Sequence, residues 1–308
     1  MAAAPVVSVV PGGSVGQRLA SRSRAYLALT KPRIIELLLV TTVPTMVVAA
    51  KGLPPAWLVL ATLVGGTLAA GGANAINMVA DRDIDKLMER TAHRPLVTGE
   101  LEPGPALVFA LVLEALAFIE LATVVNLLSA VLALSATLFY VFVYTLWLKR
   151  TSSQNIVIGG AAGAVPVLVG WAAVTGRLGW APFALFAIVF VWTPPHFWAL
   201  ALRYRDDYAA AEVPMLPVVT SFAGTARRII FYTVLLWIVS LVFAPIAGMG
   251  LLYVGTAFVL GAVFLFFAVR LAREATVSRA MGLFGYSITY LTLLFVAMAV
   301  DALVRHGA

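Results

Sequence analysis

Residues 56–85 read AWLVLATLVGGTLAAGGANAINMVADRDID and join an uncharged apolar stretch to a cluster of charges. The part before Asp81 is long enough to cross a bilayer core of roughly 30 Å as a helix, which takes about 20 apolar residues. Asp81, Asp83 and Asp85 follow directly. A predicted membrane helix that ends in three acidic residues therefore indicates both the fold class and the place of a candidate site.

The whole chain has the composition of an integral membrane protein. Of its 308 residues, 62% are apolar and 11% are charged, whereas soluble domains have about 25% charged residues. A soluble fold of this size lacks the polar groups to cover so much apolar surface. The chain contains no cysteine, which excludes thiol catalysis, iron–sulfur clusters, cysteine-type zinc sites and disulfides.

Apolar stretches predict nine membrane-spanning helices. A transmembrane β-barrel is excluded, because its strands alternate in polarity. We expect an all-α integral membrane fold, with a disordered cytoplasmic tail over residues 1–25 and one polytopic membrane domain over residues 26–308. The predicted spans are residues 32–50, 56–79, 104–124, 127–147, 155–173, 179–200, 226–248, 250–270 and 280–303.

Basic residues predict the orientation of these spans. With the N-terminus in the cytoplasm, 18 of the 21 Lys and Arg residues fall on the inner side, as the positive-inside rule requires. The C-terminus is then external, and we expect a multi-pass protein of the plasma membrane.

Two long inner loops, near 80–103 and 201–225, hold nine of the 14 acidic residues. This concentration of acids at one face indicates a chemical role.

The first acidic loop predicts a metal site. On a continuous helix, Asn77, Asp81 and Asp85 share one face, because they are spaced four residues apart. Asp83 lies near the opposite side. An amide and two carboxylates offer the oxygen ligands that Mg²⁺ prefers, with room for substrate phosphates. The alternative is a solvated helix end. Arg90 and Arg94 follow in RTAHRPL, and their forked guanidinium groups suit phosphate oxygens.

The sixth predicted span contains FVWTPPHFWALAL, residues 190–202. Pro194 and Pro195 predict an interruption of the helix, which a membrane tolerates only against protein or a wet cavity. His196 is the one histidine within a predicted span. It is either a satisfied structural residue or, as an ionisable group in the membrane, a functional one. Glu114, in the third predicted span, must be paired or protonated.

Two motifs carry a family resemblance. NMVADRDIDKLMERTAHRPL, residues 77–96, resembles the intramembrane prenyltransferases of the UbiA type, and WTPPHFWAL, residues 192–200, is similar to their haem-using branch. The resemblance covers nearly the whole chain from Thr30. It implies nine helices around a central cavity. It also implies that Asn77, Asp81 and Asp85 bind Mg²⁺ and a prenyl diphosphate.

The resemblance assigns further residues to the donor side. Asp207, and after it Asp206, are expected to contact the metal or the diphosphate. Many members have DxxxD at this point, whereas here Glu212 follows Asp207 after five residues, which leaves Glu212 in doubt as a ligand. Arg90, Arg94, Lys149 and Arg150 are expected to bind the diphosphate, although the last two are equally interpretable as positive-inside anchors. The spacing from Tyr144 to Lys149 is one residue longer than the family pattern.

On the acceptor side, the resemblance implies that His196 ligates or hydrogen-bonds a haem and that Trp192 and Trp198 stack on it; helix packing is the alternative for both tryptophans. The implied reaction transfers a farnesyl group from farnesyl diphosphate to a vinyl group of haem b, giving haem O and diphosphate, with Mg²⁺ as cofactor. The partners are these substrates and the lipid bilayer, with no nucleic acid. A haem A synthase or a terminal oxidase is a candidate assembly partner.

Three other functions remain open at this point. The same fold could prenylate a quinone or chlorophyll precursor, but WTPPHFWAL favours the haem-using branch. A transporter usually places its coupling site near the membrane midplane, whereas these acids gather at one face. A b-type cytochrome needs paired axial histidines in the membrane, and the predicted spans offer one.

Overall fold

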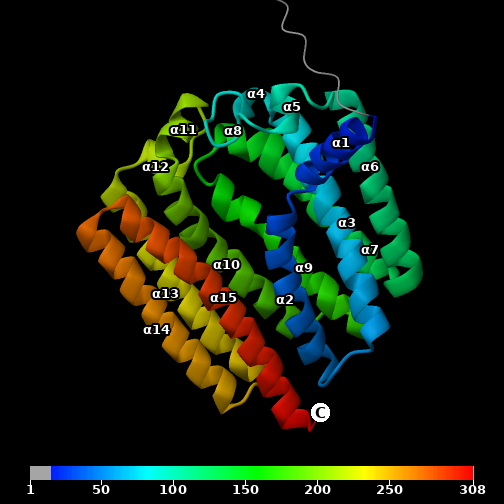
Figure 1. Cartoon of the computed structure of the whole chain (residues 1–308). Coiled ribbons are helices and arrows are strands. Elements are labelled where there is room, and N and C mark those ends of the chain that lie inside the picture. The colour runs from blue at the N-terminus through cyan, green and yellow to red at the C-terminus, as the bar shows by residue number, and fades with distance from the viewer. Residues whose placement is uncertain (1–14, 308) are drawn as a thin grey trace, which may run out of the picture.

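Long helices run side by side between two ends of the molecule, and short helices gather at one of these ends (Figure 1). The structure is a computed structural model that describes residues 15–307, without the side chains of residues 15, 17–19, 33, 34 and 36–39. The described residues form helices and no strand. The marked C-terminus lies at the end opposite the short helices α4, α5, α11 and α12 (Figure 1).

Eight helices of the described chain are long and apolar enough to cross a membrane. α2, which packs against α9 and α15, is the ninth long helix of this part of the chain. The all-α membrane fold is therefore confirmed. The ends of each predicted span lie within a few residues of the ends of a long helix or of its π-helical extension. The long helices are α2 (Pro32–Ala50), α3 (Ala56–Ala80), α6 (Pro103–Glu120), α7 (Leu127–Leu138), α9 (Asn155–Thr175), α10 (Trp180–Arg203), α13 (Phe222–Ala247), α14 (Leu251–Glu274) and α15 (Val277–His306).

Two of these helices continue into π-helical turns, and short helices form the cap over the bundle. The π-helix η1 (Leu121–Val125) extends α6, and η2 (Phe139–Leu148) extends α7 as far as α8 (Lys149–Thr151). The remaining short elements are α1 (Val15–Thr30), α4 (Arg82–Asp85), α5 (Pro95–Thr98), α11 (Arg205–Ala210) and α12 (Leu216–Val219).

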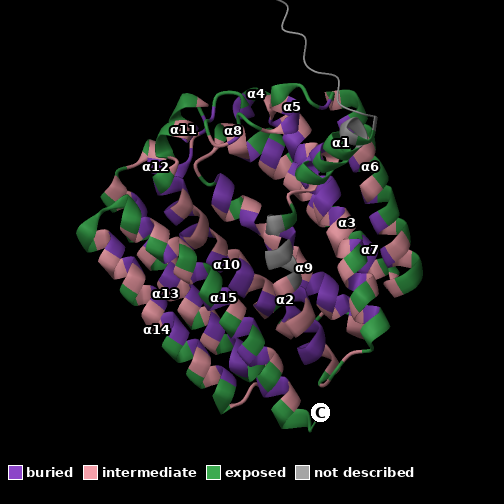
Figure 2. Cartoon of the chain, in the orientation of Figure 1, coloured by how far each residue is buried: buried purple, intermediate pink, exposed green. Residues whose placement is uncertain are grey.

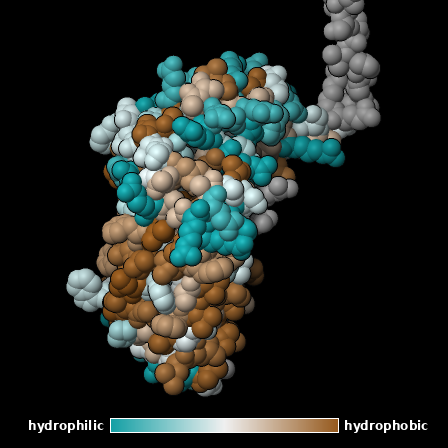
Figure 3. All heavy atoms as spheres, turned by 90° about the vertical axis from the view of Figure 1, so that its left-hand side faces the viewer, coloured by the Kyte–Doolittle hydropathy of each residue, from teal (hydrophilic) through white to brown (hydrophobic). Residues whose placement is uncertain are grey.

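The surface divides in the way that a bilayer requires. The face drawn in Figure 3 is apolar over the long helices and hydrophilic over the end that carries the short ones. Large apolar side chains are exposed along the long helices, among them Leu111, Phe142 and Phe266. Buried residues face the inside of the bundle (Figure 2). Because lipid tails are as apolar as these side chains, their exposure carries no penalty in a membrane.

The second half of the predicted tail overlaps a helix. Val15–Thr30 forms α1, so residues 15–25 of the predicted tail are helical, while residues 1–14 lie outside the described residues. Ala25 and Leu29 of α1 are buried against Met78 and Leu96. The ring of Tyr26 also contacts that of Phe109 of α6, with 4.9 Å between the ring centres and an angle of 59° between the planes. The apolar face of α1 therefore binds it to the bundle, which the charged residues of this segment did not indicate.

The predicted interruption at the proline pair was wrong. α10 continues from Trp180 to Arg203 through Pro194 and Pro195, and both prolines are buried. Neither proline can donate to the carbonyl four residues earlier, so Phe190 and Val191 lose their usual helical donors. Packing of α10 against α9, α13 and α15 holds the helix together across this point.

Asp301 of α15 is a buried acid that serves the fold. Its carboxylate accepts hydrogen bonds from the backbone amides of Gly250 at 2.6 Å and Tyr253 at 3.2 Å. These amides lie at the N-terminal end of α14, where the helix has no carbonyl acceptors of its own for them. Asp301 thus caps α14 from the neighbouring helix and fixes the two helices against each other.

We expect Asp301→Ala to lower the free energy of unfolding by about 1–3 kcal/mol, because it leaves two buried amides without an acceptor. Thermal unfolding of the purified protein in detergent measures this change. Asp206→Ala, which removes an exposed carboxylate, is the matched control and should unfold at the wild-type temperature. Equal stability of the two variants would remove the capping role from Asp301.

Candidate functional site

The end of α3 carries the acidic residues predicted to form one face. α3 ends at Ala80, and the amide of Asp85 donates to the carbonyl of Asp81 at 2.8 Å, so a helical turn continues into α4. Asp81 and Asp85 are 0% and 2% exposed, whereas the side chain of Asp83 is 65% exposed. The structure therefore directs Asn77, Asp81 and Asp85 inward and Asp83 outward, as the helical spacing predicts.

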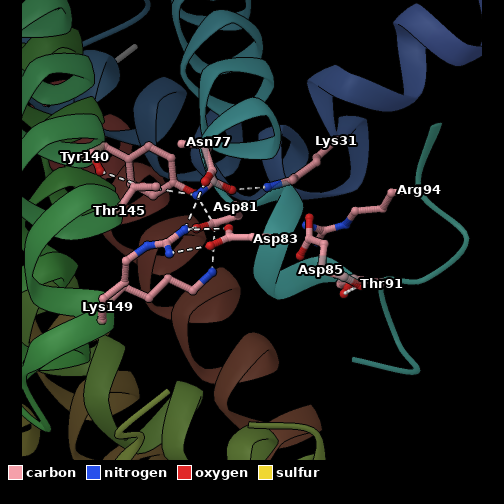
Figure 4. Close-up of polar contacts among 12 residues, drawn as sticks. Lys31, Asn77, Asp81, Asp83, Asp85, Thr91, Arg94, Tyr140, Thr145 and Lys149 are labelled. Atoms are coloured by element: carbon pink, nitrogen blue, oxygen red, sulfur yellow. Dashed lines mark hydrogen bonds and ion pairs between the residues drawn. The ribbon is translucent and has the colours of Figure 1, made fainter. Parts of the chain in front are cut away.

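Each of the two buried carboxylates at the end of α3 has a cation (Figure 4). Lys149 Nζ lies 2.6 Å from Asp81 Oδ2, and Arg94 Nη1 lies 2.5 Å from Asp85 Oδ2. Asn77 donates from Nδ2 to Asp81 Oδ2 at 2.7 Å. A buried carboxylate without such a partner would be strongly destabilising. Lys149 is 11% exposed at its side chain, so its place is in this cluster and not among lipid headgroups.

Arg150 has a different role from Lys149. Its guanidinium makes a two-point contact with Asp83, at 2.7 and 2.8 Å, and donates to the carbonyl of Ala80 at 2.9 Å. The hydrogen bond from Arg150 lowers the pKa of Asp83 to about 2. Arg150 thus caps α3 and fixes the outward-facing acid, which supports the positions of Asp81 and Asp85.

Lys31 is a site residue that the sequence reasoning missed. It lies between α1 and α2 with a left-handed backbone (φ 52°), and its Nζ donates to Asn77 Oδ1 at 2.7 Å (Figure 4). Desolvation lowers its pKa to about 7, and the charges of Arg94 and Lys149 act in the same direction. The only signal in the sequence is a lysine just before the first span, which resembles an ordinary positive-inside residue.

The π-helix η2 explains the long spacing between Tyr144 and Lys149. The amide of Lys149 donates to the carbonyl of Tyr144, five residues earlier, which is the hydrogen bond of a π-helix. Thr145 in the same helix accepts from Asn77 Nδ2 at 3.0 Å. The extra residue is therefore absorbed by a wider turn, and Lys149 still reaches Asp81.

The residues at the end of α3 fit a divalent cation. Asp81 Oδ1 is buried and accepts no hydrogen bond, with Arg150 Nη2 at 3.8 Å. A charged oxygen that is withdrawn from water and unbonded is a ligand available to a hard cation. Among the described residues, however, no group of three His, Asp or Glu side chains converges. Asp206 and Asp207 therefore do not join Asp81 and Asp85 in one cluster, and the predicted four-carboxylate metal site is not formed by the described residues.

The second acidic loop contacts the first through Asp207. Its Oδ2 accepts from the backbone amide of Arg90 at 3.2 Å. The guanidinium of Arg90 lies 5.4 Å from the ring centre of Tyr204, and its Nε is buried without a hydrogen-bond partner. Asp206 is exposed. Glu212 has a left-handed backbone (φ 55°) in the turn that follows α11. Asp207 thus positions the Arg90 loop, whereas Asp206 on α11 and Glu212 in the following turn are exposed to solvent.

A cavity of about 750 Å³ lies between the helices, and its lining includes His196 but none of the charged residues at the end of α3. Asn74 and Tyr140 line it near the acidic residues, and Trp192 and His196 line it on the side of α10. His196 stacks on Trp192 at 4.1 Å and on Phe284 of α15 at 4.7 Å. Much of the remaining wall consists of small or apolar side chains, which suits a long hydrocarbon substrate.

Two residues singled out in the sequence lie outside this cavity lining. Trp198 is 1% exposed and packs edge-on against Tyr232 of α13 at 5.4 Å, so it belongs to the helix packing and not to the acceptor side. Glu114 is buried and accepts a hydrogen bond from Thr137 Oγ1 at 3.1 Å. Thr137 is the partner that the sequence did not identify for Glu114.

Comparisons with known proteins agree with this architecture. The protoheme IX farnesyltransferase of Parafrankia sp. (strain EAN1pec) is 55% identical over 298 residues, which cover 96% of this chain and 95% of that protein. The UbiA homologue from Archaeoglobus fulgidus bound to GPP and Mg²⁺ has a TM-score of 0.65 at 17% identity, covering 90% of this chain and 99% of that one.

A structure reported for digeranylgeranylglyceryl phosphate synthase has a TM-score of 0.76 at 17% identity, covering 92% of this chain and 99% of that one. At such identities these two structures bear on the fold alone. The sequence profile of the UbiA prenyltransferase family matches residues 38–299, which is most of the chain. The chain therefore belongs to the UbiA prenyltransferase family.

Proposed function

We propose that the protein transfers a farnesyl group from farnesyl diphosphate to a vinyl group of haem b, giving haem O and diphosphate. The observation that carries this proposal is the 55% identity, over 96% of the chain, to a protein named protoheme IX farnesyltransferase. Two features of the site support it: a charged cluster suited to a diphosphate at the end of α3, and His196 with its aromatic neighbours on the wall of the cavity.

The charged cluster supplies the electrostatics of the leaving group. Asp81 and Asp85 would hold Mg²⁺, which supplies charge neutralisation of the departing diphosphate when it is bound. Lys31, Arg94 and Lys149 already lie against the ligand residues and would turn toward the phosphate oxygens. Lysine and arginine held in place before the anion arrives stabilise the charge that develops as the farnesyl carbon–oxygen bond breaks.

The cavity directs the steps that come after bond cleavage. The allylic cation is attacked by the vinyl carbon of haem b, which forms the new carbon–carbon bond. Water adds to the resulting cation and loses a proton, which leaves the hydroxyethylfarnesyl group of haem O. The apolar walls keep the two substrates next to each other and restrict water near the first cation. Trp192 and His196 would contact the macrocycle, and Asp207 would hold the Arg90 loop at the diphosphate end.

Product formation is the direct test of this proposal. Purified protein in detergent, given haem b, farnesyl diphosphate and Mg²⁺, should yield a product with the mass of haem b plus a farnesyl group and a hydroxyl group. Mass spectrometry of the extracted haem detects it, and a chelator should stop its formation. Transfer to a quinone or chlorophyll precursor and not to haem b would assign the chain to another branch of the family.

Aspartate variants test the charged cluster. Asp81→Asn and Asp85→Asn should each lower kcat by on the order of a hundredfold or more, because each removes a charged oxygen at the developing charge. Asp83→Asn should cost less than about tenfold, since Asp83 faces outward. Thermal unfolding accompanies the assay to show that each variant is folded. An Asp83→Asn enzyme as impaired as Asp81→Asn would contradict the inward-facing arrangement.

The orientation in the membrane is also part of the proposal. The distribution of basic residues favours a cytoplasmic cap, a plasma-membrane location and an external C-terminus. A protein that consumes the apolar product, such as haem A synthase or a terminal oxidase, is the expected partner, because haem O would leave into the bilayer.

Reporter fusions measure this orientation. A reporter after Ala308 should be active only outside the cytoplasm, and one inserted in the 80–103 loop only inside it. Two reporters on the same side would mean that one of the nine long helices does not cross the membrane.

A further inference from the structure

His196 is bonded to a residue that the sequence did not single out. Its Nδ1 lies 2.7 Å from the hydroxyl of Ser287, which is 0% exposed and belongs to α15. The two residues are 91 positions apart in the chain, so the contact depends on the packing of α10 against α15.

The environment of Ser287 settles the direction of this hydrogen bond. Ser287 Oγ lies 2.6 Å from the carbonyl oxygen of Phe284. A carbonyl oxygen only accepts, so the hydroxyl proton must lie between these two oxygens. A serine hydroxyl has one proton, and toward His196 it can then only accept. Nδ1 of His196 is therefore the protonated nitrogen.

The other nitrogen of His196 faces the cavity. A neutral imidazole carries one proton, so Nε2 has a free electron pair, and a charged ring within a membrane span would be costly. Among the described residues, Nε2 has no hydrogen-bond partner and is not one of the occluded polar atoms. His196 lines the 750 Å³ cavity. The free electron pair is thus presented to whatever the cavity holds.

Further contacts hold this arrangement in place. The indole Nε1 of Trp192 donates to the backbone carbonyl of Ser287 at 2.8 Å, and the indole ring stacks on the imidazole with an angle of 20°. Phe284 also stacks on the imidazole, at 28°. The ring can neither turn freely nor exchange its two nitrogens without breaking these contacts.

We propose that Ser287 is a positioning residue that fixes His196 in the Nδ1–H form and so presents Nε2 to the iron of haem b. The inference rests on the proposed function, in which haem is the substrate. Metal-binding histidines commonly donate their second nitrogen to an acceptor, which sets the tautomer and the ring orientation. Ser287 supplies that acceptor from the helix facing His196.

The first experiment determines the tautomer of His196 in the protein without haem. Protein labelled with ¹⁵N-histidine has three labelled residues, and His196→Ala identifies the signals of His196. We expect the nitrogen shifts of a protonated Nδ1 and an unprotonated Nε2 in the wild type. The proposal is overturned if Nε2 carries the proton in the folded wild-type protein.

The second experiment measures how the loss of the Ser287 hydroxyl changes haem binding. Affinity for haem b and its absorption spectrum are measured for Ser287→Ala, Ser287→Thr and His196→Ala, together with farnesyl diphosphate affinity. Ser240→Ala is the matched control, because it removes an equally buried hydroxyl outside the cavity. Ser287→Ala should weaken haem binding by roughly tenfold to a hundredfold and alter the spectrum. Ser287→Thr should restore both, and farnesyl diphosphate binding should stay unchanged.

The outcomes separate this inference from the proposed function. If His196→Ala alters the haem spectrum but Ser287→Ala does not, Ser287 has no positioning role. If the wild type makes haem O and His196→Ala keeps the wild-type spectrum and affinity, the function holds and the iron contact is refuted. A wild-type protein that neither binds nor farnesylates haem b would refute the proposed function itself.

Discussion

Asp81 and Asp85 are almost fully withdrawn from water, and each is paired with a cation at 2.5–2.6 Å. Buried carboxylates without such partners would be protonated or would unfold the site. The need to pair them determines much of the cap: the loop that carries Arg94 must fold back over α4, and the fourth span must deliver Lys149 to the end of α3. In the proposed reaction the same cations would contact the diphosphate, so that structural compensation and anion binding would use one set of side chains.

The sequence predicted the features that depend on helical periodicity and on the length of an apolar stretch that can cross a bilayer. The spans follow from apolar stretches, and the inward face of Asn77, Asp81 and Asp85 follows from their spacing. The inward face agrees with the structure because helical hydrogen bonding continues from α3 into α4. The acidic loops were also placed correctly at one end of the bundle, where the short helices lie.

Other features depend on tertiary packing and had no local signal. The proline pair predicted an interruption, but neighbouring helices hold α10 together across it. Trp198 resembled an acceptor residue in the sequence and packs on Tyr232. Lys31 was indistinguishable from a topology-determining lysine until its contact with Asn77 was visible. The π-helix before Lys149 changes the hydrogen-bond period within one helix, which a hydrophobic pattern of the usual 3.6 residues does not reveal.

The cap has a consequence for the order of assembly in the membrane. Lys149 is 68 residues from Asp81, and Arg90 is 117 residues from Asp207, so neither contact forms within a single hairpin. Spanning helices are stable individually once inserted and associate afterwards. During insertion the acidic segments stay in water, where their charges are solvated. The contact between Arg90 and Asp207 can therefore form only after the sixth span and the segment that follows it have been synthesised, whereas the contact of Lys149 with Asp81 requires only the fourth span.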